Sequence, residues 1–171
     1  MEGLTGAISA PEPLSDRHVL DQFDCGVEAL NAWLHRRAAR NENDGASRTY
    51  VIHAGNRVVG YYSLAATSVS HAIATGKARR NMPDPIPAAL LARLALDTKW
   101  QGQKLGVELL QDAVLRVVGA AHVIGIRAML VHAISGHAKA FYERYGFRPS
   151  PIEPATLMMT VEEIRRLLKQ E

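Results

Sequence analysis

A stretch near the middle of the sequence combines glycines, amides and a cation at spacings suited to phosphate binding. The apolar run Leu94-Ala-Leu96 leads towards Gln101-Gly-Gln-Lys104-Leu-Gly106, and helical apolar spacing follows to about position 121. The first backbone N–H groups of a helix have no partners inside it, and the helix dipole favours negative charge there. Glycines let the backbone approach a ligand closely. The pattern therefore predicts a pyrophosphate site at a strand–turn–helix junction, and with it a phosphate-bearing cofactor and an enzyme.

A tyrosine further along the chain is the second residue able to do chemistry. Tyr142 lies in a segment that predicts a helix beginning at Ser135 or Gly136, and a phenol can hold or give a proton. A packed helix aromatic is the alternative interpretation. Ser135 is expected to cap this helix. Cys25 is the only thiol, and we interpret it as a small residue at the start of a helix, not as a nucleophile.

The elements that must position these residues follow from hydrophobic periodicity and turn signals. Predicted helices cover 27–40, 104–121, 135–145 and a C-terminal segment opened by the capping box Thr160-Val-Glu-Glu163. Predicted strands cover 48–54, 58–68, 90–96, 127–133, 147–150 and 156–160, the first two joined by a Gly55-Asn56 hairpin turn. Residues 1–24 predict an irregular segment with a short strand, and 71–87 a surface loop. We expect one α/β domain over residues 1–171.

Composition narrows the class of protein. The 171 residues are 47% hydrophobic and 22% charged, which is ordinary for a globular domain. The sequence has no apolar run of roughly 20 residues, and its start lacks a signal peptide's basic and apolar regions. With one cysteine and no basic leader, we expect a reduced, cytoplasmic setting. The seven histidines are scattered, so no metal site is expected.

Basic residues gather at two places, although the net charge is only +3. One cluster is Arg36, Arg37 and Arg40 near a predicted helix end, and the other is Lys77, Arg79 and Arg80 in the predicted loop. Such clusters can meet phosphates. A solvated basic surface is the alternative.

Together these segments resemble the GCN5-related N-acetyltransferase (GNAT) family. The family's acetyl-CoA motif is Gln/Arg-x-x-Gly-x-Gly/Ala; here Gln101 and Gly106 match it, and Lys104 replaces the central glycine, where its ammonium could lie beside a cofactor phosphate. The segment 138–147 resembles the family's helix–Gly–strand region. The resemblance implies a mixed, mostly antiparallel sheet flanked by helices on both faces, with acetyl-CoA as cofactor.

The same resemblance implies roles for individual residues. Tyr142 would be the general acid that protonates the leaving sulfur, with Tyr145 ranked second. An α-amine titrates near 8, so transfer can be direct without a protein base. The expected cofactor-binding residues are Leu94, Ala95, Leu96, Gln101, Gly102, Gln103, Lys104, Leu105, Gly106, Ser135, Ala138, Phe141 and Tyr145.

A narrower resemblance is to the acetyltransferase toxins of bacterial toxin–antitoxin pairs, carried by segments 23–34, 61–65, 93–97 and 151–160. It implies acetylation of the α-amine of aminoacyl-tRNA, which stops translation. It also implies a ribbon–helix–helix antitoxin, contact with operator DNA only through that partner, and no membrane; homodimers are common in the group. The expected tRNA contacts are Arg36, Arg37, Arg40, Lys77, Arg79, Arg80 and Arg93. Two alternatives stay open: an ordinary GNAT enzyme acting on a small-molecule or protein amine, and a non-catalytic basic binding module.

Overall fold

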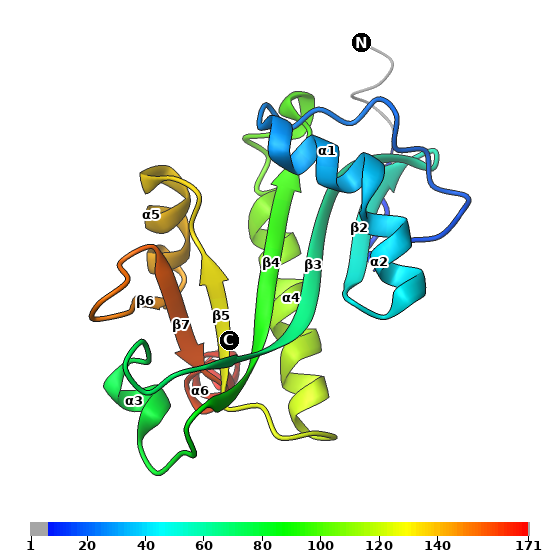
Figure 1. Cartoon of the computed structure of the whole chain (residues 1–171). Coiled ribbons are helices and arrows are strands. Elements are labelled where there is room, and N and C mark those ends of the chain that lie inside the picture. The colour runs from blue at the N-terminus through cyan, green and yellow to red at the C-terminus, as the bar shows by residue number, and fades with distance from the viewer. Residues whose placement is uncertain (1–6, 171) are drawn as a thin grey trace. The chain divides into compact units, whose positions relative to one another are not determined.

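A mixed sheet in the strand order β1-β2-β3-β4-β5-β7-β6 runs through the computed structural model, which describes residues 7–170 (Figure 1). The strands are β1 (Glu12–Pro13), β2 (Arg48–Ala54), β3 (Arg57–Val69), β4 (Ile86–Leu96), β5 (Ala128–His132), β6 (Arg148–Pro149) and β7 (Thr156–Thr160). The helices are α1 (Glu28–Arg36), α2 (Ala38–Asp44), α3 (Gly76–Arg79), α4 (Leu105–Ala121), α5 (Gly136–Arg144) and α6 (Val161–Lys169). Only the pairing of β4 with β5 is parallel among the registers described. The expected mixed, mostly antiparallel α/β fold is confirmed.

The chain forms two compact units. The first comprises the chain up to Ala65 together with Ala92–Ala113, and the second comprises Ala66–Leu91 and the chain from Val114. Strands β3 and β4 and helix α4 each run from one unit into the other. The first six residues of the irregular segment expected over 1–24 lie outside the described residues, and the expected short strand is β1.

The β2–β3 hairpin confirms the turn predicted from Gly55-Asn56. Both turn residues have positive φ, +56° and +68°, as a two-residue turn of this twist requires. The antiparallel register runs from Arg48 opposite Leu64 to Ala54 opposite Arg57, with a shift between Ile52 and His53. Strand β1 pairs with β2 on the other side, where Glu12 lies opposite Val51.

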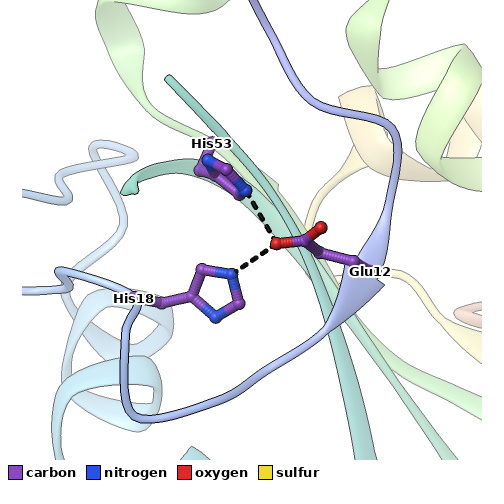
Figure 2. A group of neighbouring side chains, drawn as sticks. All are labelled: Glu12, His18 and His53. Carbon is purple, nitrogen blue, oxygen red and sulfur yellow. Dashed lines mark hydrogen bonds and ion pairs between the residues drawn. The ribbon is translucent and has the colours of Figure 1, made fainter. Parts of the chain in front are cut away.

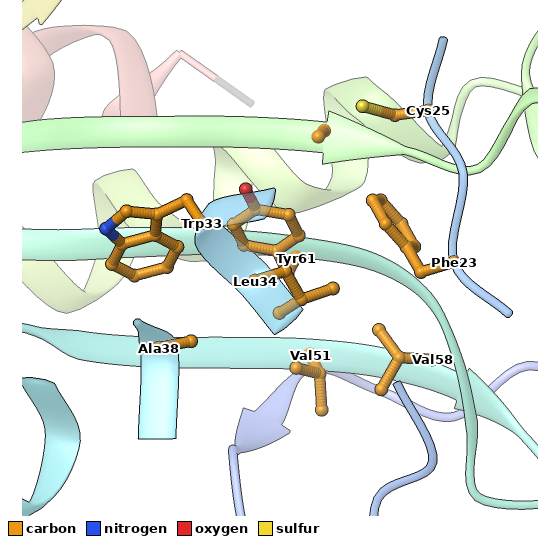
Figure 3. Close-up of a cluster of buried hydrophobic side chains, with 9 residues drawn as sticks. Phe23, Cys25, Trp33, Leu34, Ala38, Val51, Val58 and Tyr61 are labelled. Carbon is orange, nitrogen blue, oxygen red and sulfur yellow. The ribbon is translucent and has the colours of Figure 1, made fainter. Parts of the chain in front are cut away.

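The core of the first unit lies between α1 and the hairpin (Figure 3). Trp33 stacks on Tyr61 with ring centroids 5.9 Å apart, and Phe23 meets the Tyr61 ring edge-on at 5.5 Å. The single helix predicted over 27–40 is wrong, because the chain leaves helical geometry at Arg37 (φ −120°) and restarts as α2. The restart buries Ala38 completely in the same core.

The second unit corrects the surface loop predicted over 71–87. Helix α3 lies inside it, capped by the Thr75 hydroxyl, and β4 begins at Ile86 instead of position 90. Ala74, Ala78 and Ile86 are fully buried against β5 and β7, and this packing orders the segment. A four-residue helix is too short to show a helical period in the sequence.

The remaining predictions for this unit are confirmed within a residue or two. Helix α5 is capped by Ser135, whose hydroxyl accepts the Ala138 N–H at 3.0 Å, and Gly146 follows its end with a φ of +101°. Both halves of the Thr160–Glu163 capping box are present at α6. None of the helices described over residues 7–170 is long and apolar enough to cross a membrane.

Candidate active site

The turn between β4 and α4 has the shape that phosphate binding requires. Gly102 and Lys104 both adopt the left-handed backbone conformation, with φ of +81° and +65°. Alternating backbone of this kind turns successive N–H groups towards one side, and α4 adds the unpartnered N–H groups of its first turn. A Cβ built on Gly102 would meet nothing within 4 Å, so that side of the turn is open. These residues fit a pyrophosphate.

The strand that leads into this turn is fixed by the core. Ala95 is buried in the Trp33–Tyr61 cluster, while Leu94 and Leu96 on either side of it are half-buried. A 3₁₀ turn (Thr98–Trp100) follows, anchored by the buried Trp100 ring. The strand end and the helix start are therefore held by packing on both sides of the exposed residues 101–104.

Gln101, expected to bind cofactor, directs its side chain to the protein backbone. Its amide donates to the carbonyl oxygen of Leu96 at 2.9 Å and to that of Cys25 at 3.3 Å. The side chains of Gln103 and Lys104 make no hydrogen bond among those described for residues 7–170.

Tyr142 lies on α5 in the second unit, packed between two aromatic rings. The centroid of Phe141 is 5.3 Å from its ring and that of Phe147 is 5.8 Å away, both edge-on. Tyr142 is 8% exposed, while Phe141 and Tyr145 beside it are half-buried. Burial raises the pKa of Tyr142 to about 12, because the phenolate would lose its hydration. The phenol is protonated at neutral pH, as an ordinary tyrosine is, and is available as a proton donor.

Cys25 has the environment of a structural thiol. Its side chain is buried, its Sγ–H donates to the Val27 carbonyl at 3.5 Å, and burial raises the pKa of the thiol. A raised pKa lowers the thiolate fraction, which is the nucleophilic form. The structure thus agrees with its assignment as a packing residue at the start of α1.

The first basic cluster lies in the first unit and is exposed. Arg36 ends α1, Arg37 separates the two helices and Arg40 lies on α2, where it pairs with Asp44 at 3.8 Å. Arg93 differs from these, because its guanidinium stacks over the Trp33 ring at 4.2 Å. Partial burial lowers the pKa of Arg93.

The second basic cluster lies on α3 and directly after it. Lys77 pairs with Glu163 at 3.1 Å, and Lys77 and Arg80 line a hollow of about 300 Å³. Arg127 and Arg166 line the same hollow, although the sequence did not single them out. Arg127 is tied to the Ala78 and Lys77 carbonyls at 3.2 and 2.8 Å, so it also fixes α3.

Three polar residues near the turn were missed by sequence reasoning. Asp97 and Asn31 are buried, at 3% and 7% exposure, and Asp24 hydrogen-bonds to both the Asn31 side chain and, through its backbone N–H, Asp97. The sequence held one sign of this network: Asn31 is a polar residue on the apolar face of the helix predicted over 27–40.

The structure also brings together Glu12, His18 and His53, which the scattered histidines of the sequence did not predict (Figure 2). Oε1 of Glu12 lies 2.8 Å from Nε2 of His18 and 2.7 Å from Nε2 of His53. The three ligand atoms lie within 4.8 Å of one another, close enough to share a metal ion.

The other ring nitrogens indicate a different role for this cluster. Nδ1 of His18 accepts the Ser15 backbone N–H at 2.9 Å, and Nδ1 of His53 accepts that of Asn56 at 3.2 Å. Because each Nδ1 accepts a hydrogen bond, the ring N–H is at Nε2 and points at Glu12. A metal-binding histidine normally donates from its second nitrogen. Arg17 also hydrogen-bonds to the same carboxylate oxygen, so hydrogen bonds to Glu12 join residues 12–18 to the hairpin.

The mixed α/β fold and the positive-φ turn before α4 fit an enzyme that binds a phosphate-bearing cofactor. The acetyltransferase (GNAT) domain family matches residues 45–149, which include both the turn and Tyr142. The chain belongs to the GNAT acetyltransferase family.

Individual members of this family with known activities are similar to the chain over nearly its whole length. The chain is 48% identical over 160 residues to a tRNA-acetylating toxin of Mycobacterium tuberculosis, covering 94% of this chain and 96% of that one. Among solved structures, AtaT complexed with acetyl-methionyl-tRNAfMet matches with a TM-score of 0.86 at 29% identity, covering 95% and 99% of the two chains.

Two further structures contain partners. A mutant AtaT toxin bound to the C-terminus of the antitoxin AtaR and acetyl-CoA matches with a TM-score of 0.82 at 30% identity, covering 95% of this chain and 99% of that one. The AtaT–AtaR complex bound to DNA matches with a TM-score of 0.76 at 29% identity and the same coverage.

Proposed function

We propose that this chain transfers the acetyl group of acetyl-CoA to the α-amine of an aminoacyl-tRNA and so stops translation, as the toxin of a toxin–antitoxin pair. The observation that carries the proposal is the 48% identity, over 94% of this chain, to a tRNA-acetylating toxin. The positive-φ turn before α4 and the buried, protonated Tyr142 support it from the geometry.

The turn and the first residues of α4 hold the pyrophosphate of the cofactor. Gly102, Lys104 and Gly106 belong to this cradle, and the dipole of the 17-residue helix α4 favours the negative charge. The exposed Lys104 ammonium adds a positive charge at the same turn. Leu94 and Leu96 of β4 offer backbone donors towards the acyl end.

When bound, acetyl-CoA supplies the acetyl group as a thioester whose sulfur leaves as a thiolate. Tyr142 holds a proton at its phenolic oxygen up to a pH of about 12 and gives it to that sulfur as the carbon–sulfur bond breaks. An α-amine titrates near 8, so part of it is neutral and able to attack without a protein base. The attacking amine forms the carbon–nitrogen bond and then loses a proton to water, and the Tyr142 phenolate regains its proton from water. The inert environment of Cys25 supports direct transfer without an acyl-enzyme.

The exposed cations position the tRNA without reading its sequence. The residues proposed for these phosphate contacts are Arg36, Arg37, Arg40, Lys77, Arg79 and Arg80, with Arg93 held on Trp33. The relatives bound to an antitoxin and to DNA support a partner antitoxin for this chain. The family resemblance supports a ribbon–helix–helix antitoxin that carries the complex to operator DNA, a homodimer, and a cytoplasmic location, where charged tRNA is found.

Labelled acetyl-CoA tests the proposal when it is offered with three acceptors: a pool of charged tRNAs, the same tRNAs without amino acids, and a polyamine. We expect label on the charged tRNAs alone, released together with the amino acid when the ester is hydrolysed. Label on the polyamine but not on charged tRNA would establish the ordinary acetyltransferase instead. A protein that does not bind acetyl-CoA at all would instead be the non-catalytic basic binding module.

A further inference from the structure

A network of polar groups, in which Asp97 and Asn31 are buried, joins the segment before α1 to the beginning of the cofactor turn. The Asp97 carboxylate accepts the backbone N–H of Asp24 at 3.1 Å and that of Lys99 at 3.0 Å. The Thr98 N–H donates back to the Asp24 carbonyl at 2.9 Å. The Asp97 residue is only 3% exposed, so its carboxylate would be costly to leave without these two donors.

Asn31 closes the network from α1. Its side-chain amide donates to the Asp24 carboxylate at 2.9 Å, and its carbonyl oxygen accepts the Cys25 N–H at 2.8 Å. The Asp24 carboxylate also accepts the Gly26 N–H at 2.9 Å, and the hydrogen bonds from Gly26 and Asn31 lower the pKa of Asp24. The backbone of residues 24–26 is thereby fixed.

Gln101 connects this fixed segment to the turn. Its amide spans the carbonyls of Leu96, at the end of β4, and Cys25, in the fixed segment. Beyond Gln101 the chain is exposed as far as Lys104 and includes two residues in left-handed conformation. An exposed, strained turn needs such an anchor if it is to present its N–H groups to a ligand without a further ordering cost.

We infer that Gln101 is a positioning residue: its side chain does not touch the cofactor but presets the pyrophosphate-binding turn, using the network of Asp24, Asn31 and Asp97 as its anchor. The inference rests on the proposed function only in taking a pyrophosphate as the ligand. It accounts for the choice of glutamine or arginine at the first motif position, since both side chains donate N–H hydrogen bonds to carbonyls.

The test compares Gln101→Met, which keeps the length and loses the donors, with Gln101→Arg, which restores donors. For Gln101→Met we expect the Kd and KM for acetyl-CoA to rise about fivefold, with kcat within about twofold of wild type, because one to two hydrogen bonds are lost. Gln101→Arg should return both constants towards wild type. Asn31→Ala, which weakens the anchor away from the ligand, should raise the same constants.

Thr160→Ala is the matched control, because it removes a side chain that hydrogen-bonds to the backbone in the second unit and should leave the Kd unchanged. Hydrogen exchange of residues 101–106 in the ligand-free protein separates the inference from the proposed function. Faster exchange in Gln101→Met than in wild type supports positioning even if acetyl-CoA does not bind. Unchanged exchange together with an unchanged Kd would overturn the inference.

Discussion

Lys104 adopts the same left-handed backbone conformation as Gly102, two residues earlier, with φ of +65° against +81°. The GNAT motif has glycine at the position of Lys104, so this chain keeps the backbone shape of the motif while placing a cation in it. A non-glycine residue in this conformation costs about 1–2 kcal/mol, because its Cβ crowds the carbonyl oxygen. The departure from the motif therefore changes the charge of the turn and its strain but not its shape.

Replacing Lys104 by glycine should relieve this strain. We expect Lys104→Gly to have a free energy of unfolding about 1 kcal/mol above that of Lys104→Ala, because both lose the ammonium but only glycine escapes the Cβ penalty. Urea denaturation of the two variants measures the difference. An alanine variant as stable as the glycine variant would mean that position 104 is not left-handed.

High pH should destabilise the protein through its buried tyrosine. The pKa of Tyr142 rises from 10.0 to about 12 on folding, so between those values the unfolded chain loses a proton that the folded chain keeps. The free energy of unfolding then falls as pH rises, by about 3 kcal/mol for two pKa units, and the contribution is fully present below pH 10. Denaturation at pH about 9 and about 11 spans half of this range and should show a loss of about 1.3 kcal/mol.

Tyr142→Phe is the control for that measurement. It should reduce the pH dependence but not abolish it, because burial also raises the pKa of Tyr61. An identical pH dependence in wild type and Tyr142→Phe would show that Tyr142 is not buried in the folded protein.

Zinc should have no effect on the Glu12–His18–His53 cluster. Both histidine rings present Nε2–H to Glu12, so a metal would have to displace those protons and face the backbone N–H groups at Nδ1. We expect the unfolding temperature to be the same with excess Zn²⁺ and with a chelator. A metal at a hundred times its Kd would raise the free energy of unfolding by about 2.7 kcal/mol. A rise of that size, abolished by Glu12→Gln, would contradict this assignment.

Charge reversal in the second basic cluster should act on tRNA alone. The paired change Arg79→Glu and Arg80→Glu removes two exposed cations, so it should weaken tRNA binding and flatten its salt dependence. Binding of acetyl-CoA should not change. Arg148→Glu, an exposed reversal in the same unit outside both clusters, is the comparison. Equal losses of tRNA and acetyl-CoA binding would show that Arg79 and Arg80 are not specific contacts for tRNA.

The parts of the fold that local sequence determines were predictable. Gly55-Asn56 specifies its hairpin because both residues tolerate positive φ, and Thr160 with Glu163 specifies the start of α6. The break at Arg37 and the order in 71–87 were not predictable, because both depend on burial against residues distant in the sequence. Ala38 and Ala78 are small residues whose burial no periodicity revealed.

In the candidate site, too, the features set by contiguous sequence were predictable and those set by distant contacts were not. The turn around Gly102 and the helix of Tyr142 are contiguous patterns, and the sequence predicted both. The carbonyl partners of Gln101 were missed, because Cys25 is 76 residues away along the chain. The burial that raises the pKa of Tyr142 also required the packed structure, since Phe141 beside it was an equally good core residue by sequence.

The most direct measurement of the central claim is the mass of the amino acid recovered from aminoacyl-tRNA after reaction with acetyl-CoA, followed over time for wild type, Tyr142→Phe and Tyr145→Phe. We expect wild type to place an acetyl group on the α-amine, and Tyr142→Phe to do so about a hundredfold more slowly or worse, as for loss of a general acid. Tyr145→Phe should stay near the wild-type rate. An unmodified amino acid in the presence of wild-type protein that binds acetyl-CoA, or equal rates for the two phenylalanine variants, would contradict it.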